Sequence, residues 1–237
     1  MEGNDFDGRC VLVTGAAGNL GRAVARLFAQ RGANLVLIGR RQAELEHLFG
    51  KDGERQLLCA LDLLDAAQVE AGVARAFERF GRIDVLCNLA GGFRMGEPVH
   101  ETKDATLDFL FDINARTLLY AARAVVPRML AAGFGKIVNV GAFAAQRGAA
   151  NMGAYTAAKA SVIRLTEAMS AELREKNINV NCVLPNVIDT PENRVAMPAA
   201  DPTRWVAPED LAQVIAFLAS DAARAVHGAA LPVAGLS

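Results

Sequence analysis

Cysteine and histidine are scarce in this sequence, and no spacing among them suggests a metal site or a disulfide framework. The 237 residues include four cysteines and three histidines. The cysteines are far apart without any Cys-x-x-Cys pair, and the histidines lack metal-ligand spacing with one another or with the cysteines. Three cysteines lie in strand-like apolar runs, so buried free thiols are expected. Neither metal chemistry nor a nucleophilic triad is predicted.

The sequence also lacks an excess of charge and any long hydrophobic run. Its 25 Lys and Arg against 26 Asp and Glu give a net charge of −1, which disfavours nucleic acid and anionic membranes as partners. Every apolar run is interrupted well before the roughly 18 residues that a membrane span requires. Residues 1–9 contain acidic residues and no apolar segment, so no signal or transit peptide is recognisable and a cytoplasmic location is expected.

Short apolar runs alternate with longer amphipathic stretches, which is the pattern of βαβ units and a parallel sheet. Strands are expected at Cys10–Thr14, Asn34–Gly39, Arg55–Leu61, Ile83–Leu89, Gly135–Val140, Asn177–Val183 and Ala229–Val233. Several of these runs are almost continuously apolar, which predicts burial on both faces of the sheet. A hydrophobic content of 52% and a length of 237 residues suit one large domain, residues 1–237, with a sizeable core.

The amphipathic stretches predict the helices that cover this sheet. Helices are expected at Leu20–Gln30, Arg41–Phe49, Asp65–Arg79, Lys103–Ala131, Gly153–Lys176 and Pro208–Ser220. Asp65 is placed to accept hydrogen bonds from the free N–H groups of its helix. Residues 185–207 are proline-rich and irregular, so we expect a lid or a substrate loop there.

A glycine-rich turn links the first strand to the first helix. It reads Thr14-Gly15-Ala16-Ala17-Gly18-Asn19-Leu20-Gly21, the context in which glycines let a backbone approach a pyrophosphate at a helix N-terminus. A tight turn without a ligand is the alternative. The second strand ends at Gly39 with Arg40 and Arg41 and no acid, which favours NADP(H) over NAD(H) unless these arginines merely solvate the start of a helix.

Tyr155 and Lys159 lie four residues apart in a predicted helix, so their Cβ atoms should be about 5 to 6 Å apart on one face. A tyrosine pKa of about 10 is poorly suited to acid–base work near neutrality. A neighbouring ammonium favours the phenolate, so we expect Lys159 to lower the pKa of Tyr155.

The glycine turn, Asp62, Asn88-Leu89-Ala90-Gly91, Asn114 and the Tyr155/Lys159 pair occur in an order and spacing that resembles the short-chain dehydrogenase/reductase superfamily over almost the whole chain. The resemblance implies an α/β doubly wound Rossmann fold, with a seven-stranded parallel sheet of order 3-2-1-4-5-6-7 and helices on both faces. It also implies a homodimer or homotetramer. Asn19 departs from the usual middle glycine, and asparagine tolerates left-handed backbone.

The same resemblance implies roles for individual residues. Tyr155 would donate a proton to the substrate, Lys159 would bind the nicotinamide ribose, and Asn114 would order a relaying water. The cofactor-binding residues would be Gly15, Gly18, Asn19, Leu20, Gly21, Arg40, Arg41, Asp62, Leu63, Asn88, Ala90, Gly91, Tyr155, Lys159, Pro185, Ile188 and Thr190. Asp62 would bind the adenine, and Thr190 would bind the nicotinamide amide.

The usual catalytic serine is absent, because the position thirteen residues before Tyr155 is Ala142. Losing one hydrogen-bond donor that is preorganised for the reacting oxygen typically lowers the catalytic rate by a factor of about 10² to 10³. Gly141-Ala142, Ala90-Gly91-Gly92 and much of the segment 184–205 resemble dihydropteridine reductase, which also carries alanine there. We therefore expect NADPH-dependent hydride transfer to a small activated acceptor, such as a quinonoid dihydropterin or a quinone.

Two alternatives remain open. A 3-oxoacyl, ketone or alcohol oxidoreductase would need another donor, with Asn151 and Gln146 as candidates, and a nucleotide-binding sensor would perform no catalysis. The residues that could wall a flat ring are Phe93, Met95, Met197 and Trp205. Arg194 and Asp189 could orient a polar substrate edge or form an ion pair that pins the loop.

Overall fold

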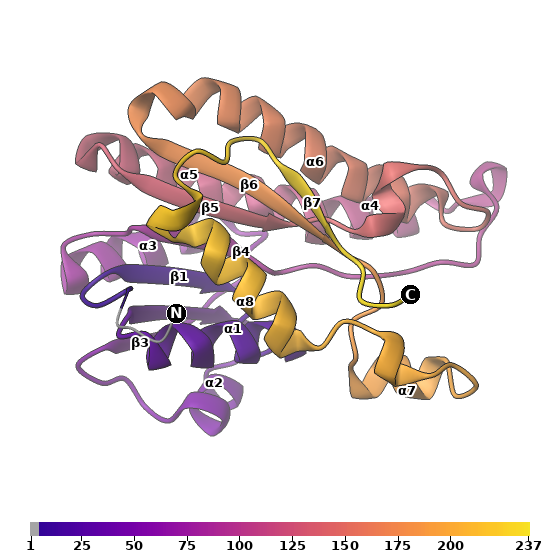
Figure 1. Ribbon diagram of the computed structural model, residues 1–237, viewed down its shortest axis with the longest axis horizontal. Helices are drawn as coiled ribbons and strands as arrows, with labels where there is room; N and C mark the ends of the chain where they lie inside the picture. Colours follow the sequence, from indigo (N-terminus) through magenta and orange to yellow (C-terminus); the bar gives the residue numbers. More distant parts are fainter. Residues whose placement is uncertain (1–4) are drawn as a thin grey trace.

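The computed structural model describes residues 5–237 and places seven strands in one parallel sheet of order β3-β2-β1-β4-β5-β6-β7 (Figure 1). The strands are β1 (Cys10–Thr14), β2 (Asn34–Gly39), β3 (Gln56–Ala60), β4 (Val85–Asn88), β5 (Gly135–Val140), β6 (Ile178–Pro185) and β7 (Ala230–Val233). The predicted fold class and strand order are confirmed. β6 runs two residues further than predicted, because Leu184 and Pro185 still pair with β7.

Alternate residues of the central strands face two helical layers. Val11 and Val13 pack into the cluster that contains α1 (Asn19–Gln30) and α8 (Pro208–Ala219), whereas Cys10 and Leu12 pack toward α3 (Ala66–Phe80) and α5 (Thr117–Ala132). Figure 1 shows these two layers on opposite faces of the sheet, with α6 (Gly153–Leu173) beside α5. The apolar strand runs therefore meet a helix on each face, as predicted.

The helix predicted at residues 103–131 is wrong as a continuous element. The structure has α4 (Asp104–Phe111), a π-helical turn (Asp112–Arg116) and then α5. Asn114 is buried in the π turn, where its Nδ2 donates to the carbonyl oxygens of Leu110 at 2.9 Å and Gly92 at 3.0 Å. Its Oδ1 accepts from Gly92 N at 3.1 Å. A side chain that anchors a distant loop thus accompanies the wider turn, a feature common at functional sites.

Of the remaining helical elements, α2 (Gln42–Phe49) agrees with the prediction, whereas α7 (Pro191–Ala196) and the 3₁₀ turns were not predicted as separate elements. The 3₁₀ turns lie at Val99–Glu101, Phe143–Gln146, Arg174–Lys176, Pro202–Arg204 and Asp221–Ala223. α7 is a short helix within the segment expected to be irregular, and Thr190 caps it by accepting from Asn193 N at 3.2 Å. α4 and α7 lie at the same end of the sheet (Figure 1).

Two smaller expectations are also confirmed. Asp65 caps α3 by accepting from the backbone N–H groups of Ala67 and Gln68 at 2.9 and 3.1 Å. All four cysteines are free and buried. No helix in residues 5–237 is long and apolar enough to cross a bilayer.

Candidate dinucleotide and active site

The glycine turn between β1 and α1 has no room for side chains at two positions. Gly15 has φ +66°, and a Cβ there would lie 2.9 Å from Ala90 N. A Cβ at Gly21 would lie 2.7 Å from the carbonyl oxygen of Ala16 and would overlap that of Gly15. The turn therefore requires glycine both for its left-handed bend and for the close approach of the first helix.

The ends of β1 and β4 are locked together directly beneath this turn. Thr14 Oγ1 accepts from Leu89 N at 3.1 Å and from Ala90 N at 3.2 Å. One hydroxyl thereby fixes the carboxyl ends of two adjacent parallel strands where the strand order reverses. This switch point is where doubly wound sheets bind their ligands.

A cavity of about 860 Å³ opens along the carboxyl ends of β1, β2 and β4. The predicted cofactor residues that line it are Gly15, Gly18, Asn19, Arg40, Arg41, Asp62, Leu63, Ala90 and Gly91. The glycine turn, the two arginines and the β4 end thus face one space, although they are far apart in sequence. Its size and backbone-lined floor fit a dinucleotide.

The other predicted cofactor residues do not line this cavity. Leu20 and Gly21 lie in the first turn of α1, and Pro185 ends β6. Ile188 forms an isolated bridge with Val206. Asn88 is buried at the end of β4, where its Nδ2 donates to Asn139 Oδ1 at 2.9 Å, so it joins neighbouring strands beneath the cavity floor.

The basic corner predicted after β2 is present. Arg40 and Arg41 both line the cavity at the start of α2, and Arg41 pairs with Glu44 at 3.0 Å. Within the part of the chain that the structure describes, Arg40 makes no ion pair. Asp62 lies across the cavity, with its Oδ1 accepting from Leu64 N at 2.9 Å.

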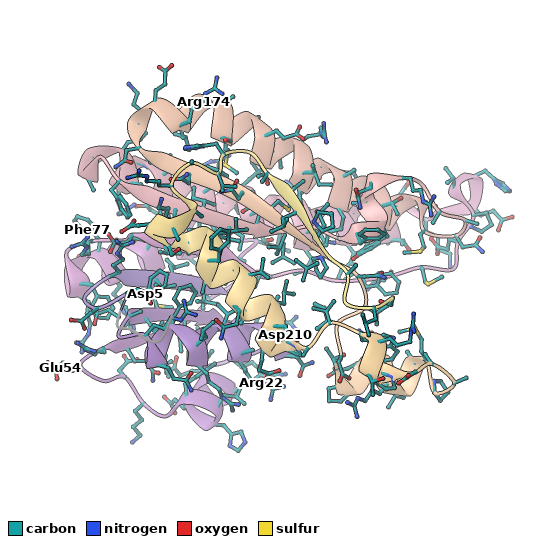
Figure 2. All side chains as sticks on the ribbon, in the orientation of Figure 1. Asp5, Arg22, Glu54, Phe77, Arg174 and Asp210 are labelled. Atoms are coloured by element: carbon teal, nitrogen blue, oxygen red, sulfur yellow. The ribbon has the colours of Figure 1, made fainter. Side chains whose placement is uncertain are left out.

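Asn19 does not use the left-handed backbone that was expected of it. It is the first residue of α1, and the non-glycine residues with positive φ in the described chain are Asn151 and Asn177. Its Nδ2 instead donates to Glu192 Oε2 at 2.8 Å, and its Oδ1 accepts from Arg22. Figure 2 shows Arg22 near the start of α1.

Glu192 is a cavity residue that sequence reasoning missed. It lies on α7 and lines the same space as the glycine turn, 173 residues away along the chain. Its pKa is lowered by hydrogen bonds, first from its own backbone N–H and then from Thr190 and Asn19. A charged carboxylate therefore stands beside the turn that would hold a pyrophosphate, and no local sequence pattern reveals this.

We expect Glu192→Gln to tighten NADPH binding by about two- to fivefold at low salt, because it removes a like charge near the phosphates. The glutamine oxygen can still accept from Asn19 Nδ2. Fluorescence titration would measure the dissociation constant at low and high salt, and the gain should shrink as salt screens the charges. Glu172→Gln on α6 is the charge-matched control. Weaker binding in the variant would show instead that the Asn19–Glu192 contact holds the cofactor in place.

Lys159 and Asn114 converge on Gly91. A Cβ at Gly91 would lie 3.0 Å from Asn114 Oδ1 and 3.1 Å from Lys159 Nζ, so this position must stay bare for both to approach. Lys159 Nζ donates to the carbonyl oxygen of Val140 at 2.8 Å. Burial lowers the pKa of Lys159 to about 8. The three sequence motifs that carry these residues are thus brought together at one point.

Tyr155 differs from its predicted electrostatics. Burial raises its pKa to about 12, whereas a lowered pKa was expected from the neighbouring lysine. The Phe93 ring packs edge-on against it, with centroids 4.8 Å apart at 87°. Lys159 directs its ammonium to Val140, so desolvation decides the direction of the shift. The phenol therefore keeps its proton at neutral pH, although a raised pKa also makes it a weaker acid.

The surroundings of Tyr155 contain no serine at the usual position. Ala142 is 5% exposed and packs in the cluster that Tyr155 joins. Of the two possible replacement donors, Gln146 donates its side-chain amide to the carbonyl oxygen of Phe143 at 3.3 Å. Asn151 lines a second cavity of about 180 Å³ together with Tyr155.

The residues that were predicted to wall a flat ring do not all lie at one cavity. Met95 lines the smaller cavity and Phe93 contacts Tyr155, whereas Trp205 is buried at 9% exposure and lines neither described cavity. Arg194 donates to both carboxylate oxygens of Asp189, at 2.6 and 2.7 Å. That ion pair ties the loop before α7 to the helix, as expected if the two residues hold the loop in place.

Comparison with known proteins places this architecture in a family. A family model described as enoyl-(acyl carrier protein) reductase matches residues 15–235. Cis-4-hydroxycyclohexanecarboxylate dehydrogenase of Sinomonas cyclohexanicum is 37% identical, with 98% of each chain covered. The 3-oxoacyl-(acyl-carrier-protein) reductase FabG of Thermotoga maritima is 34% identical over 97% of this chain and 98% of that relative.

Solved structures with a similar fold agree with these sequence relatives. A short-chain dehydrogenase/reductase from Brucella melitensis has a TM-score of 0.89 at 34% identity, covering 98% of this chain and 97% of that one. A 3-ketoacyl-(acyl-carrier-protein) reductase from the same organism, complexed with NADH, has a TM-score of 0.86 at 30% identity over 97% and 98% of the two chains. The NADP-bound structure of ElxO has a TM-score of 0.88 at 25% identity over 96% and 97%. The chain belongs to the short-chain dehydrogenase/reductase superfamily of NAD(P)-dependent oxidoreductases.

Proposed function

We propose that this chain is an NADP(H)-preferring reductase of a small, activated, planar acceptor such as a quinonoid dihydropterin or a quinone. The observation that carries the proposal is the buried methyl group of Ala142 in the cluster with Tyr155. An ordinary carbonyl needs the donor missing there, which is worth about 10² to 10³ in rate. An electron-poor conjugated acceptor needs less polarisation, so it suits this site best. The relatives named above are not dihydropteridine reductases, and that finer resemblance stays a prediction.

Three residues of the chain would have separate roles in such a reduction. Tyr155, which is protonated at neutral pH, donates its phenolic proton to the oxygen or nitrogen of the acceptor. The buried ammonium of Lys159 then stabilises the phenolate that is left. Both Nδ2 donors of Asn114 are used by Gly92 and Leu110, so a water relay at this residue would use an acceptor, either its backbone carbonyl or the second lone pair of Oδ1.

The bound dinucleotide supplies the hydride. Gly15, Gly18, Ala90 and Gly91 would present their backbone to it in the cavity, and Asp62, which lines the same cavity, would bind the adenine. A Cβ at Gly91, which lines this cavity, would lie 3.1 Å from Lys159 Nζ, which is consistent with the reacting end of the dinucleotide lying near Gly91.

A second candidate is a ketone or secondary-alcohol oxidoreductase. Asn151 favours it, since this residue lines the smaller cavity beside Tyr155 and could replace the missing hydroxyl donor. The dehydrogenase and 3-oxoacyl reductase relatives make this chemistry plausible. A non-catalytic sensor is set aside, because the chain is a member of an oxidoreductase superfamily.

A substrate panel separates these two functions. NADPH consumption would be followed with a quinonoid dihydropterin, several quinones, cyclohexanone and a 3-oxoacyl thioester, each against an enzyme-free blank. We expect kcat/KM to be higher for the quinonoid and quinone acceptors. Equal or faster turnover of the simple ketones would overturn the proposal in favour of the second candidate.

The cofactor preference has its own test. Arg40→Ala/Arg41→Ala should raise the dissociation constant of NADPH by about tenfold or more, because hydrogen bonds to a charged phosphate are among the stronger ones. Binding of NADH, which lacks the 2′-phosphate, serves as the internal control and should change little. An equal loss for both dinucleotides would mean that the arginines do not distinguish them.

A further inference from the structure

The segment Gly91–Gly96 connects the two cavities at the active site. It has no regular secondary structure, and Phe93 within it packs on Tyr155. The next residue, Arg94, lines the smaller cavity with Tyr155. Its guanidinium carbon lies 3.7 Å from the ring centroid of Phe109, a residue that lines the larger cavity. Arg94 therefore lines the smaller cavity and contacts a residue in the wall of the larger one.

The stacked guanidinium of Arg94 has no acidic partner. Within residues 5–237 it makes no ion pair and no side-chain hydrogen bond, whereas Arg116 and Arg194 each pair with a nearby aspartate. Stacking on Phe109 fixes the plane of the guanidinium and leaves its edge, which carries the N–H donors, free to bind a ligand.

The one carboxylate that lines the same cavity is already engaged. Glu97 Oε2 accepts from Lys103 N at 3.2 Å, its Oε1 accepts from Thr106 Oγ1 at 3.3 Å, and Lys103 Nζ lies 4.0 Å away. Arg94 is thus the charged residue of this lining whose side chain has no ionic partner in the described chain. The other walls of the cavity include the apolar side chains of Met95, Leu110 and Met152.

These features match a small anionic ligand with an apolar body. A carboxylate accepts two parallel hydrogen bonds from a guanidinium edge, which gives direction as well as affinity. The volume of about 180 Å³ is below the range of about 300 to 1,000 Å³ that is common for drug-sized ligands. Tyr155 and Arg94 line the same space, so one compact molecule can reach both.

We propose that Arg94 is a specificity-determining residue that binds a carboxylate on the substrate while the reducible group of that substrate lies at Tyr155. The inference rests on the proposed function for the Tyr155 end alone. The substrate class it names is a small, mainly apolar carbonyl or quinonoid compound that carries a carboxylate on the side opposite the reacting group.

Equilibrium binding tests the proposal without turnover. Isothermal titration of the NADP⁺-loaded enzyme with cyclohexanecarboxylate should show binding that Arg94→Gln weakens by about tenfold or more. Cyclohexanecarboxamide, which is neutral, should bind wild type and variant alike. Arg147→Gln removes an equal charge outside this cavity and should leave carboxylate binding unchanged. Arg94→Lys should restore part of the affinity, since it keeps the charge and loses the planar edge.

Steady-state kinetics then tests the carboxylate site at Arg94 separately from the proposed reductase function. For a benzoquinone that carries a carboxylate, Arg94→Gln should raise KM with little effect on kcat, and it should not affect the matched neutral benzoquinone. Equal effects on the acidic and the neutral quinone, or carboxylate binding that does not depend on Arg94, would overturn the proposal. Binding that depends on Arg94 without reduction of any carbonyl or quinone would retain the anion site and overturn the proposed function.

Discussion

Tyr155→Phe should reduce kcat by about 10² to 10⁴, the range that a positioned general acid contributes. Phenylalanine keeps the ring that packs edge-on against Phe93 and removes only the hydroxyl. The loss should therefore appear in turnover, while the dissociation constant of NADPH stays within about twofold, because the dinucleotide cavity is lined by other residues. NADPH oxidation with the best acceptor, together with a fluorescence titration of NADPH, measures both quantities.

The chain offers a matched control, because its other tyrosine is Tyr120 on α5. Tyr120→Phe should leave kcat unchanged. A Tyr155→Phe variant that retains more than a tenth of wild-type kcat would mean that the proton comes from another group or directly from water, and the assignment of Tyr155 would fail.

The raised pKa of Tyr155 also predicts different pH dependences for reduction and for oxidation. A phenol with a pKa of about 12 is protonated at neutral pH, so it is ready to donate in the reductive direction. Oxidation would first require the phenolate and should accelerate as pH rises. The expectation of a lowered pKa came from the Tyr155/Lys159 spacing, which is right about proximity along a helix. It could not show that burial outweighs the charge.

Much of the fold could be predicted because its determinants are local. The apolar runs mark the strands, and the turn from Gly15 to Gly21 marks the join of β1 and α1, where added Cβ atoms would collide with backbone. The strand order followed from the resemblance of motifs along the chain. The apolar runs and the spacing of the glycines can be recognised without knowing their distant partners, although the close contact of Gly15 is with Ala90, far along the chain.

The features that were missed depend on contacts across the fold. The π turn at Asn114 accompanies hydrogen bonds to Gly92, twenty-two residues away. Glu192 enters the cofactor cavity because α7 folds back to Asn19, and no periodicity or cap predicts that approach. The free guanidinium of Arg94 matters only because Phe109 fixes its plane and Tyr155 shares its cavity.

Ala142→Ser should raise kcat/KM for simple ketones by about tenfold or more, toward the 10² to 10³ that a preorganised donor is worth. Ala142 has an extended backbone, with φ −156° and ψ 147°, which serine adopts without strain. It lies in the cluster that Tyr155 joins, so a hydroxyl there would be added close to the proton donor. Steady-state assays with cyclohexanone and a quinone, for wild type and variant, give the comparison.

The two substrates should respond differently, and that difference decides between the proposed functions. A quinone that already reacts without the donor should gain little, whereas a ketone should gain most of the effect. Ala71→Ser adds a hydroxyl on α3, outside the cluster that Tyr155 joins, and should change neither rate. If Ala142→Ser leaves ketone reduction unchanged while Asn151→Ala abolishes it, then Asn151 already supplies the donor. The missing serine would in that case reflect a relocated hydrogen bond and not an activated substrate.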